Sequence, residues 1–409
     1  MTGIYQAKTI ASLSEISEDE WNACCYTQQT RHNPFLSHQF LYALEESGCA
    51  TRETGWQAQH ILIHKGNKLV GVMPLYLKSH SYGEYVFDHA WADAYQHAFR
   101  NTGRNTGQNI GQNTGENYYP KLQSAVPFSP VTAPKLMVRP SEILAQNTRE
   151  IQEKMLMAAL SLVKEYQLSS LHVTFAEKAE WNLMAEHGFL KRLDQQFHWH
   201  NDGYGSFDDF LMALSSRKRK NIRKERKQAV IKNVDIEILS GKDITEEHWD
   251  HYFSFYLETG QRKWGQPYLN RRFFSLLGEK ISEKIVLIMC KREDKYIAGA
   301  LNMLSDDTLY GRYWGAIEDH KYLHFEVCYY QAIEYAIRHG LKKVEAGAQG
   351  EHKLARGYRP AATYSAHWIS NPQFRKAVAD YLVREREVVK QNQKILMDFA
   401  PFKKGNIQS

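Results

Sequence analysis

The sequence contains an internal repeat, and this repeat constrains the fold more than any other feature. Short patterns occur twice along the 409 residues, in the same order each time. An acidic helix start before tryptophan appears as ISEDEW at 16–21 and as ITEEHW at 244–249. A glycine and an aromatic residue precede a His-Trp pair by ten residues in both copies, ending at Trp199 and at Trp368. The repeat predicts a duplication with halves at residues 1–205 and 206–409.

Both halves predict the same series of elements. A hairpin is expected at 61–77 in the first half and at 285–304 in the second. A helical pattern follows at 151–166 and at 325–339, and each precedes a short apolar strand. This order predicts an α+β fold, with a mixed, mostly antiparallel sheet flanked by helices in each half.

Two segments fall outside the repeat. Residues 101–117, NTGRNTGQNIGQNTGEN, hold Ile110 as their one apolar side chain, so the sequence predicts a disordered surface loop in the first domain. Residues 374–397 predict a charged amphipathic helix that closes the second domain. Its apolar stripe fits packing against the body of the protein or binding to a partner.

The positive charge is concentrated in one segment. The chain carries 52 Lys and Arg against 46 Asp and Glu, and Arg217–Lys227 alone holds eight bases and one acid. The remainder has 44 bases and 45 acids, which disfavours a general nucleic-acid binder. The sequence predicts a basic helix over about 207–232 that is either a solvated helix or a docking site for a polyanion: cofactor phosphates, tRNA or anionic lipid head groups. The arginines expected to bind these phosphates are Arg217, Arg219, Arg223 and Arg226.

Composition and missing motifs exclude several classes of protein. The five cysteines form no C-x-x-C pair, which indicates free thiols in a reducing compartment. The N-terminus has no signal-peptide pattern, and no apolar run approaches the roughly 20 residues of a membrane span, so we expect a cytoplasmic protein. His352 has no second ligand at zinc spacing, and the common nucleotide, hydrolase and zinc motifs are absent, so no metal is expected.

Residues whose side chains could take part in catalysis or ligand binding are concentrated in three segments. His324 and Glu326 stand two apart at the start of a helix, where they could form a base with its partner or a cap. The glycine-rich segment 345–358 follows a strand and is dense in polar side chains, which is typical of a binding loop. Aromatic residues beside charges at 87–95 and 310–315 could line a cleft for a sugar or peptide, or could belong to the core.

Several of these segments resemble the FemAB-like family, labelled peptidoglycan biosynthesis/recognition and grouped with GNAT-type N-acyltransferases. The resemblance runs from about residue 33 to residue 370. The motifs that carry it are YYPKLQ at 118–123 with VPF at 126–128, LYGRYWG at 309–315, HFEVCYYQ at 324–331 and GAQGEHK at 347–353.

The resemblance implies two tandem acyl-CoA N-acyltransferase folds and transfer of an acyl or aminoacyl group to an amine of a cell-wall-related or other acceptor, a small molecule or a peptide. Acyl-CoA and aminoacyl-tRNA are the donors that it suggests. The usual GNAT pyrophosphate loop is absent from both halves, which disfavours acetyl-CoA. A non-catalytic module that recognises a muropeptide, and an RNA-binding protein acting through the basic helix, are the rival interpretations.

The sequence therefore gives a set of expected roles. Glu326 or His324 is expected to act as the base. The side chains expected to bind substrate are Arg312, Tyr313, Trp314, Glu345, Gln349, Glu351, His352, Lys353 and Arg356, together with Asp88 and Trp91 of the first half.

Overall fold

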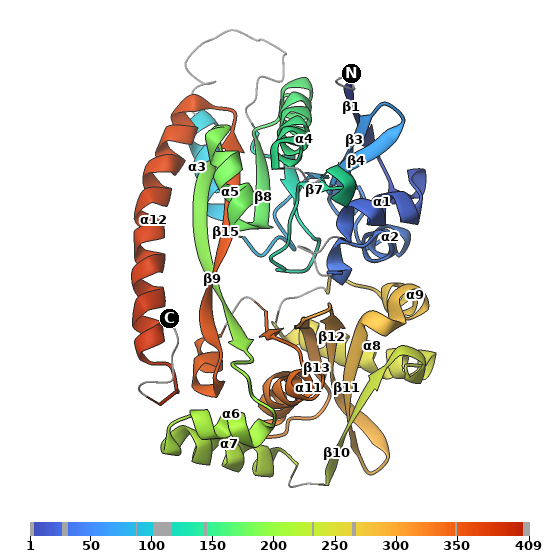
Figure 1. The fold of residues 1–409 in the computed structure, drawn as a ribbon, viewed down its shortest axis with the longest axis vertical. Helices are drawn as coiled ribbons and strands as arrows, with labels where there is room; N and C mark the ends of the chain where they lie inside the picture. Colours follow the sequence, from blue (N-terminus) through green and yellow to red (C-terminus); the bar gives the residue numbers. More distant parts are fainter. Residues whose placement is uncertain are drawn as a thin grey trace. The chain divides into compact units, whose positions relative to one another are not determined.

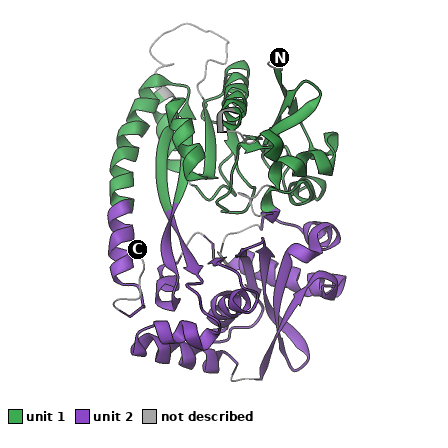
Figure 2. Cartoon of the chain, in the orientation of Figure 1, with its two compact units in different colours: residues 1–30, 35–194, 363–389 green, residues 31–34, 195–362, 390–409 purple. Residues whose placement is uncertain are grey.

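The computed structural model describes residues 4–26, 32–86, 88–100, 117–142, 145–230, 233–263, 267–347 and 350–403 (Figure 1). The chain forms two compact units, and each is assembled from several segments (Figure 2). Unit 1 comprises residues 1–30, 35–194 and 363–389, and unit 2 comprises residues 31–34, 195–362 and 390–409. Of the loop predicted at 101–117, all but Asn117 lies outside the described residues.

Unit 1 holds two groups of strands. An antiparallel sheet has the order β1 (Tyr5–Ile10), β3 (His60–Lys65), β4 (Lys68–Met73) and β7 (Met137–Val138). A second series runs from β8 (Ser170–Ala176) through β6 (Lys121–Ser124) and β5 (Tyr76–Lys78) to β2 (Trp56–Ala58), and β6 pairs with β8 in parallel. The helices are α1 (Glu18–Cys25), α2 (His38–Glu46), α3 (His89–Arg100), α4 (Ala145–Glu165) and α5 (Lys178–Glu186).

Unit 2 is built on the series β10 (Val234–Ser240), β11 (Ile285–Arg292), β12 (Lys295–Leu304), β13 (Thr308–Ala316) and β14 (Lys343–Glu345). The pairs are antiparallel except for β13 and β14, which are parallel. The helices are α6 (Phe207–Ala213), α7 (Ser216–Ala229), α8 (Glu246–Lys263), α9 (Arg271–Ile281), α10 (Leu323–Phe325) and α11 (Ala332–Arg338), and the π-helical turn Glu326–Gln331 joins the last two.

Two strands and one helix cross from one unit to the other: β9 (Leu190–His200), β15 (Arg359–Ile369) and α12 (Pro372–Asp398). The end of β9 belongs to unit 2, where His198 pairs with Glu345 of β14. The end of β15 belongs to unit 1, where His367 pairs with His172 of β8. The last strand of each predicted half, β9 in the first and β15 in the second, therefore ends in the unit that is built mainly from the other half. The compact units consequently differ from the continuous halves 1–205 and 206–409, and the duplication itself stays a prediction.

The local predictions have mixed outcomes. The hairpin at 285–304 is present as β11–β12, and that at 61–77 as β3–β4 only up to Met73, because residues 76–77 belong to β5 of the other sheet. Turns of two residues join the strands of both hairpins. The single basic helix over 207–232 is wrong, because α6 and α7 are separate helices. The break falls at Leu214, whose extended backbone buries its side chain and bridges to Phe402. The C-terminal helix is α12, which buries Leu382 but leaves Val388 on the surface.

Each unit has its own apolar core. In unit 1 the core lies between α4 and the strands β3, β4 and β8, and it includes Ile61, Met155 and Leu171. In unit 2 it includes Ile288 of β11 and Ile333 of α11. Burial of such aliphatic side chains contributes about 1.5–3 kcal/mol each. Among the described residues, every helix is too short or too polar to cross a membrane.

Candidate functional site in unit 2

The central feature of unit 2 is the point at which two parallel strands part. β13 and β14 pair over Thr308–Tyr310 and Lys343–Glu345, and β13 then continues to Ala316 after β14 has ended. Backbone and side chains beyond this point no longer face a partner strand on that edge. The carboxyl ends of parallel strands are a common place for ligand sites in α/β proteins. We call the residues gathered here the strand-end site: Arg312, His324, Tyr329, Glu345, His352 and Lys353.

Glu345 and Arg312 form the buried base of this site. Glu345 is fully buried, and it accepts a hydrogen bond from Lys343 Nζ at 2.7 Å while its Oε2 lies 3.5 Å from Arg312 Nη2. Burial opposes ionisation of this carboxyl, but the charges of His198, Lys343 and Arg312 lower the pKa of Glu345 to about 2. Burial lowers the pKa of His198 to about 4. Glu345 is therefore ionised at neutral pH and holds two cations in place.

Lys353 is the titratable group best suited to proton chemistry. It lies on a 3₁₀ turn (Glu351–Arg356) after the glycines that follow β14, and Gly347 adopts a positive φ of 78°. Its side chain is buried, and its ammonium donates to the Gly347 carbonyl at 3.1 Å. Burial lowers the pKa of Lys353 to about 8, and the positive charge of Arg312 acts in the same direction. Such a lysine holds both protonation states at significant levels near pH 8.

Rings form the more accessible part of the site. The Tyr329 hydroxyl and His352 Nε2 are 2.8 Å apart, and the His324 ring packs at 5.5 Å from Trp314 and 5.4 Å from Tyr329. The Arg356 guanidinium lies 3.5 Å from the centre of the Phe325 ring, a cation–π contact. His324 is partly exposed and His352 is exposed. Imidazoles and aromatic faces at this edge suit a ligand with an amine or a planar group.

Glu326 lies apart from this group. Its buried carboxylate accepts hydrogen bonds from Arg226 at 3.1 and 2.9 Å and from Gln331 at 2.8 Å. Glu326 and Gln331 are five residues apart, which is the spacing that a π-helical turn stacks on one side. These contacts favour an anchoring role that fixes α7 to the π turn, and a role of Glu326 as base stays a prediction.

The predicted phosphate-binding arginines have different surroundings. Arg226 pairs with Glu326 and with Glu334 at 2.7 Å, and Arg223 pairs with Asp208 at 3.0 Å. Arg219 contacts the Met212 sulfur at 3.4 Å. Arg217 is exposed at the start of α7. The four arginines therefore do not converge on one position, and their proposed role remains untested.

The two residues predicted in the first half lie in a buried cluster of unit 1. Asp88 is bonded to Lys121 at 2.6 Å, and Trp91 packs edge-on against His367 at 4.9 Å between ring centres. The side chains that make up this Lys121 cluster are Ser81, Glu84, Asp88, Lys121, His172 and His367. Each of these residues is at most 3% exposed.

The strand-end site thus includes some predicted residues and omits others. It gathers Arg312, His324, Glu345, His352 and Lys353, with Trp314 and Arg356 beside it. Glu351 is exposed on the same turn as Lys353, and the Tyr313 carbonyl accepts a hydrogen bond from Tyr252 at 3.0 Å. Gln349 lies outside the described residues. Reasoning from sequence missed Tyr329 and His198, although His198 belongs to the repeated His-Trp pair.

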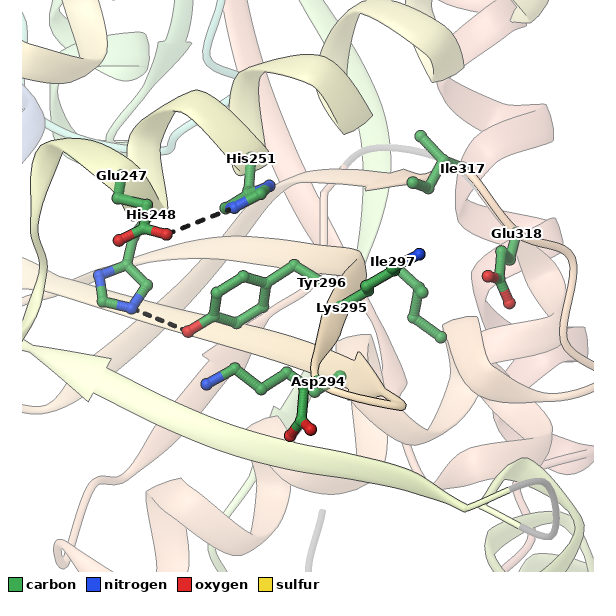
Figure 3. A pocket seen from close by; sticks show the side chains of 10 residues that line it. Glu247, His248, His251, Asp294, Lys295, Tyr296, Ile297, Ile317 and Glu318 are labelled. Atoms are coloured by element: carbon green, nitrogen blue, oxygen red, sulfur yellow. Dashed lines mark hydrogen bonds and ion pairs between the residues drawn. The ribbon is translucent and has the colours of Figure 1, made fainter.

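A separate surface pocket of about 590 Å³ lies on unit 2 (Figure 3). His248 and His251 of α8 face Tyr296 of β12 there, with His248 Nε2 2.9 Å from the Tyr296 hydroxyl. The Thr245 amide donates to His248 Nδ1, so the other ring nitrogen is the donor to Tyr296. Across the described ranges, no three His, Cys, Asp or Glu side chains are grouped so as to hold a metal ion.

The segment before α10 is a poor match to an acyl-CoA pyrophosphate. Residues 317–322, IEDHKY, contain no glycine and bring two carboxylates, Glu318 and Asp319, to the start of the helix. Glu318 is bound to Arg292 at 2.9 and 3.0 Å and to His320 at 2.7 Å. A pyrophosphate would face these negative charges in place of free backbone amides. The residues present therefore do not fit coenzyme A bound in the usual GNAT manner.

Comparison with known structures defines the class of fold. FemX aligns with a TM-score of 0.52 at 12% identity, over 89% of this chain and 98% of that one. A conserved protein of unknown function from Bacteroides thetaiotaomicron aligns with a TM-score of 0.50 at 9% identity, over 90% and 100%. A tandem GNAT protein from the clavulanic acid pathway aligns with a TM-score of 0.46 at 10% identity, over 90% and 99%. The predicted α+β class is confirmed by the mixed sheets and flanking helices and by the fold shared with FemX.

The family follows from the sequence as a whole. Residues 12–404 match the FemAB-like family, described as peptidoglycan biosynthesis/recognition, and the chain belongs to that family. A comparison with proteins of curated function gave no significant match.

Proposed function

We propose that this protein transfers an acyl or aminoacyl group to an amine of a peptidoglycan precursor, and that the strand-end site carries the reaction. The observation that supports this most directly is Lys353, whose buried ammonium donates to the Gly347 carbonyl after β14 and whose pKa burial lowers to about 8. Family membership supports the class of acceptor. An aminoacyl-tRNA donor and a cytoplasmic location remain parts of the proposal.

Acyl transfer to an amine places two demands on the site. The attacking amine loses a proton, and the carbonyl oxygen carries negative charge in the tetrahedral intermediate. In the proposal the Lys353 ammonium donates to that oxygen, and Arg312 adds a second positive charge from the buried side. His324 is the candidate base, since its ring is partly exposed beside Trp314 and His352. Trp314, His352 and Arg356 would hold the acceptor.

The ester bond of an aminoacyl donor would break as the new amide forms. The acceptor nitrogen bonds to the carbonyl carbon, its proton passes to the base, and the leaving oxygen of the donor takes up a proton. The proposal uses no step through coenzyme A, because residues 317–322 do not fit its pyrophosphate.

The test is a transfer assay with charged tRNA or acyl-CoA as donor and a muropeptide precursor as acceptor, followed by mass spectrometry of the acceptor. We expect transfer from aminoacyl-tRNA, and we expect Lys353→Met to reduce it about 100-fold, the range for loss of one oxyanion donor. Lys342→Met is the matched control, since Lys342 is exposed on the turn before β14. Full activity of Lys353→Met would overturn the site assignment.

A recognition module without catalysis is the second candidate. The observation in its favour is that two buried carboxylates in this region, Glu326 and Glu345, are held by cations. If a muropeptide stabilises the protein against heat, while no donor leads to modification of that muropeptide, recognition is the better description.

A further inference from the structure

The outer face of α7 carries a row of cations that the proposed transfer does not use. Arg217, Lys220, Lys224 and Lys227 follow one another at steps of three and four residues, so they lie along one side of the helix. All four are exposed. At about 1.5 Å of rise per residue, the row is about 15 Å long. We call these four residues the basic stripe.

The opposite face of α7 fixes this helix to the body of unit 2. Ile222 and Ala229 are buried in the apolar core, each only 2% exposed. Arg226 is bonded to Glu326 and Glu334, and the neighbouring Glu225 accepts a hydrogen bond from Arg356 at 3.0 Å. Glu225, the one acid within α7, is therefore engaged on the inner side. The basic stripe therefore faces away from the core, on a helix that is held to unit 2 by its inner face.

Two exposed apolar side chains lie near the junction of α6 and α7, from which the basic stripe begins. The segment that follows α12 lies against the α6–α7 junction, because Ser215 N donates to the Pro401 carbonyl at 2.9 Å and Lys403 N to that of Ala213 at 3.0 Å. Phe399, in that segment, is 71% exposed, and Met212, at the end of α6, is 53% exposed. Single exposed apolar side chains are common on protein surfaces, so Met212 and Phe399 gain their meaning here from the basic stripe on the same pair of helices.

We propose that the basic stripe, with Met212 and Phe399, docks this protein on an anionic phospholipid surface. Cations attract the lipid phosphates, and the two apolar side chains enter the boundary between head groups and acyl chains. Three of the four cations are lysines, compact charges that suit non-specific attraction to a charged plane. The docking lies on the membrane surface and needs no spanning helix. It is independent of the proposed transfer chemistry.

An RNA backbone is the other polyanion that could meet such a row. The four cations of the basic stripe would be enough to bind RNA phosphates. The phosphodiester backbone of a duplex, however, offers no apolar layer for Phe399 and Met212. The apolar pair therefore separates the two partners, and the observations favour the membrane.

The experiment is co-sedimentation of the full chain with vesicles of phosphatidylglycerol and phosphatidylcholine, 30:70, against vesicles of phosphatidylcholine alone, at about 0.1 M salt. We expect binding to the anionic vesicles only. Each Lys or Arg near a charged surface contributes roughly a fivefold change in partitioning. Replacing Arg217, Lys220, Lys224 and Lys227 by Gln should therefore lower binding at least about 100-fold.

The matched control removes the same charge elsewhere: Lys164, Lys178, Lys376 and Arg384, exposed on helices of unit 1, are replaced by Gln. We expect this variant to bind within about threefold of the natural protein. Phe399→Ser with Met212→Ser should weaken binding about tenfold or more while leaving its salt dependence unchanged. Circular dichroism of each variant shows whether it is folded.

Three results would overturn the proposal. Equal loss of vesicle binding in the control variant would make the attraction a general charge effect. Binding to a mixed tRNA pool that depends on the stripe, with none to vesicles, would assign the stripe to RNA. Vesicle binding unchanged by the Phe399 and Met212 substitutions would remove the apolar contacts from the interface.

Discussion

The buried polar groups of the two units share a plan but differ in access to solvent. In unit 1 they surround the parallel pair β6–β8, and in unit 2 the parallel pair β13–β14. In both, the exchanged strand brings a histidine of the repeated His-Trp pair: His367 beside His172, and His198 beside Glu345. The positive centre is Lys121 in one unit and Arg312 in the other.

The Lys121 cluster is closed, whereas the strand-end site continues to the surface. Lys121 is bonded to Ser81 at 2.8 Å, Glu84 at 2.8 Å and Asp88 at 2.6 Å, and all four are buried. In unit 2 the buried pair Arg312–Glu345 is followed by the exposed ring of His352. Removal of one partner from a closed cluster destabilises the fold, while an open cluster can meet a substrate. This difference predicts that substitutions in unit 1 affect stability and those in unit 2 affect activity.

The largest expected effect is that of Lys121→Met. It removes the cation that faces Glu84 and Asp88 and leaves a buried carboxylate without its counter-ion. Loss of one partner from a buried pair costs about 3–5 kcal/mol, and we expect that loss in the free energy of unfolding from urea titrations. Lys164→Met, on the exposed side of α4, should change it by less than about 0.5 kcal/mol. A loss below about 1 kcal/mol in Lys121→Met would show that the cluster is open to water.

The sequence predicted the fold class because repetition and periodicity are local signals. The hairpins and the helix before each late strand follow from alternation and helical spacing. The exchange of β9 and β15 between the two units could not be predicted from such local signals, because each strand has the same residue pattern whichever unit it joins. The break at Leu214 escaped for a related reason: a long-range bridge to Phe402 overrides the helical propensity of its neighbours.

The second prediction concerns Lys353→Met in unit 2. With a native pKa of about 8, below the usual 10.4 or so of lysine, ionised Lys353 costs stability below pH 8, and this cost falls as pH rises toward 10. The substitution should therefore reduce transfer about 100-fold while leaving the thermal midpoint at pH 7 unchanged or higher. Differential scanning calorimetry and the transfer assay measure the two effects. A lower midpoint together with the lost activity would mark Lys353 as structural.

The candidate site could be predicted only in part. The glycine-rich stretch after β14 indicated a loop, and its Lys353 and His352 do lie at the strand-end site. Sequence could not show that the Glu326 carboxylate is turned toward Arg226 of a helix 100 residues earlier. Nor could it show that Asp88 is buried against Lys121, because the pairing joins residues of distant segments.

The third prediction compares Glu84 with Glu345. Burial raises the pKa of Glu84 to about 7 in spite of Lys121, whereas the cations around Glu345 lower its pKa to about 2. One ammonium cannot neutralise two carboxylates, so Asp88 keeps the charge and Glu84 holds a proton. Between pH 4.5 and 7 the native state binds this proton more tightly than the unfolded state, so stability falls as pH rises. Glu84→Gln should remove this fall in the free energy of unfolding, which is on the order of 1–3 kcal/mol.

Urea titrations at pH 5 and pH 8 give the measurement for Glu84. We expect the natural protein and Glu84→Gln to have similar stability at pH 5, and Glu84→Gln to be the more stable at pH 8. Glu45→Gln is a useful contrast, because contacts with His60 lower the pKa of Glu45 although burial opposes them. Removal of this carboxylate should therefore lower the stability at pH 8, where removal of Glu84 raises it. Equal pH dependence with and without Glu84 would contradict the assignment.

The smallest expected effect separates two tyrosine hydroxyl groups, one in each cluster. The Tyr329 hydroxyl contacts the exposed ring of His352 and not a buried carboxylate, so Tyr329→Phe should cost only about 0.5 kcal/mol of stability. The Tyr118 hydroxyl donates to the buried Asp88, and a hydrogen bond to a charged group contributes about 1.5–3 kcal/mol. Tyr118→Phe should thus be the more destabilising by at least about 1 kcal/mol in paired urea titrations, while Tyr329→Phe alone lowers transfer. Equal losses of stability would mean that the strand-end site is as closed to water as the Lys121 cluster, and the division of roles between the units would then fail.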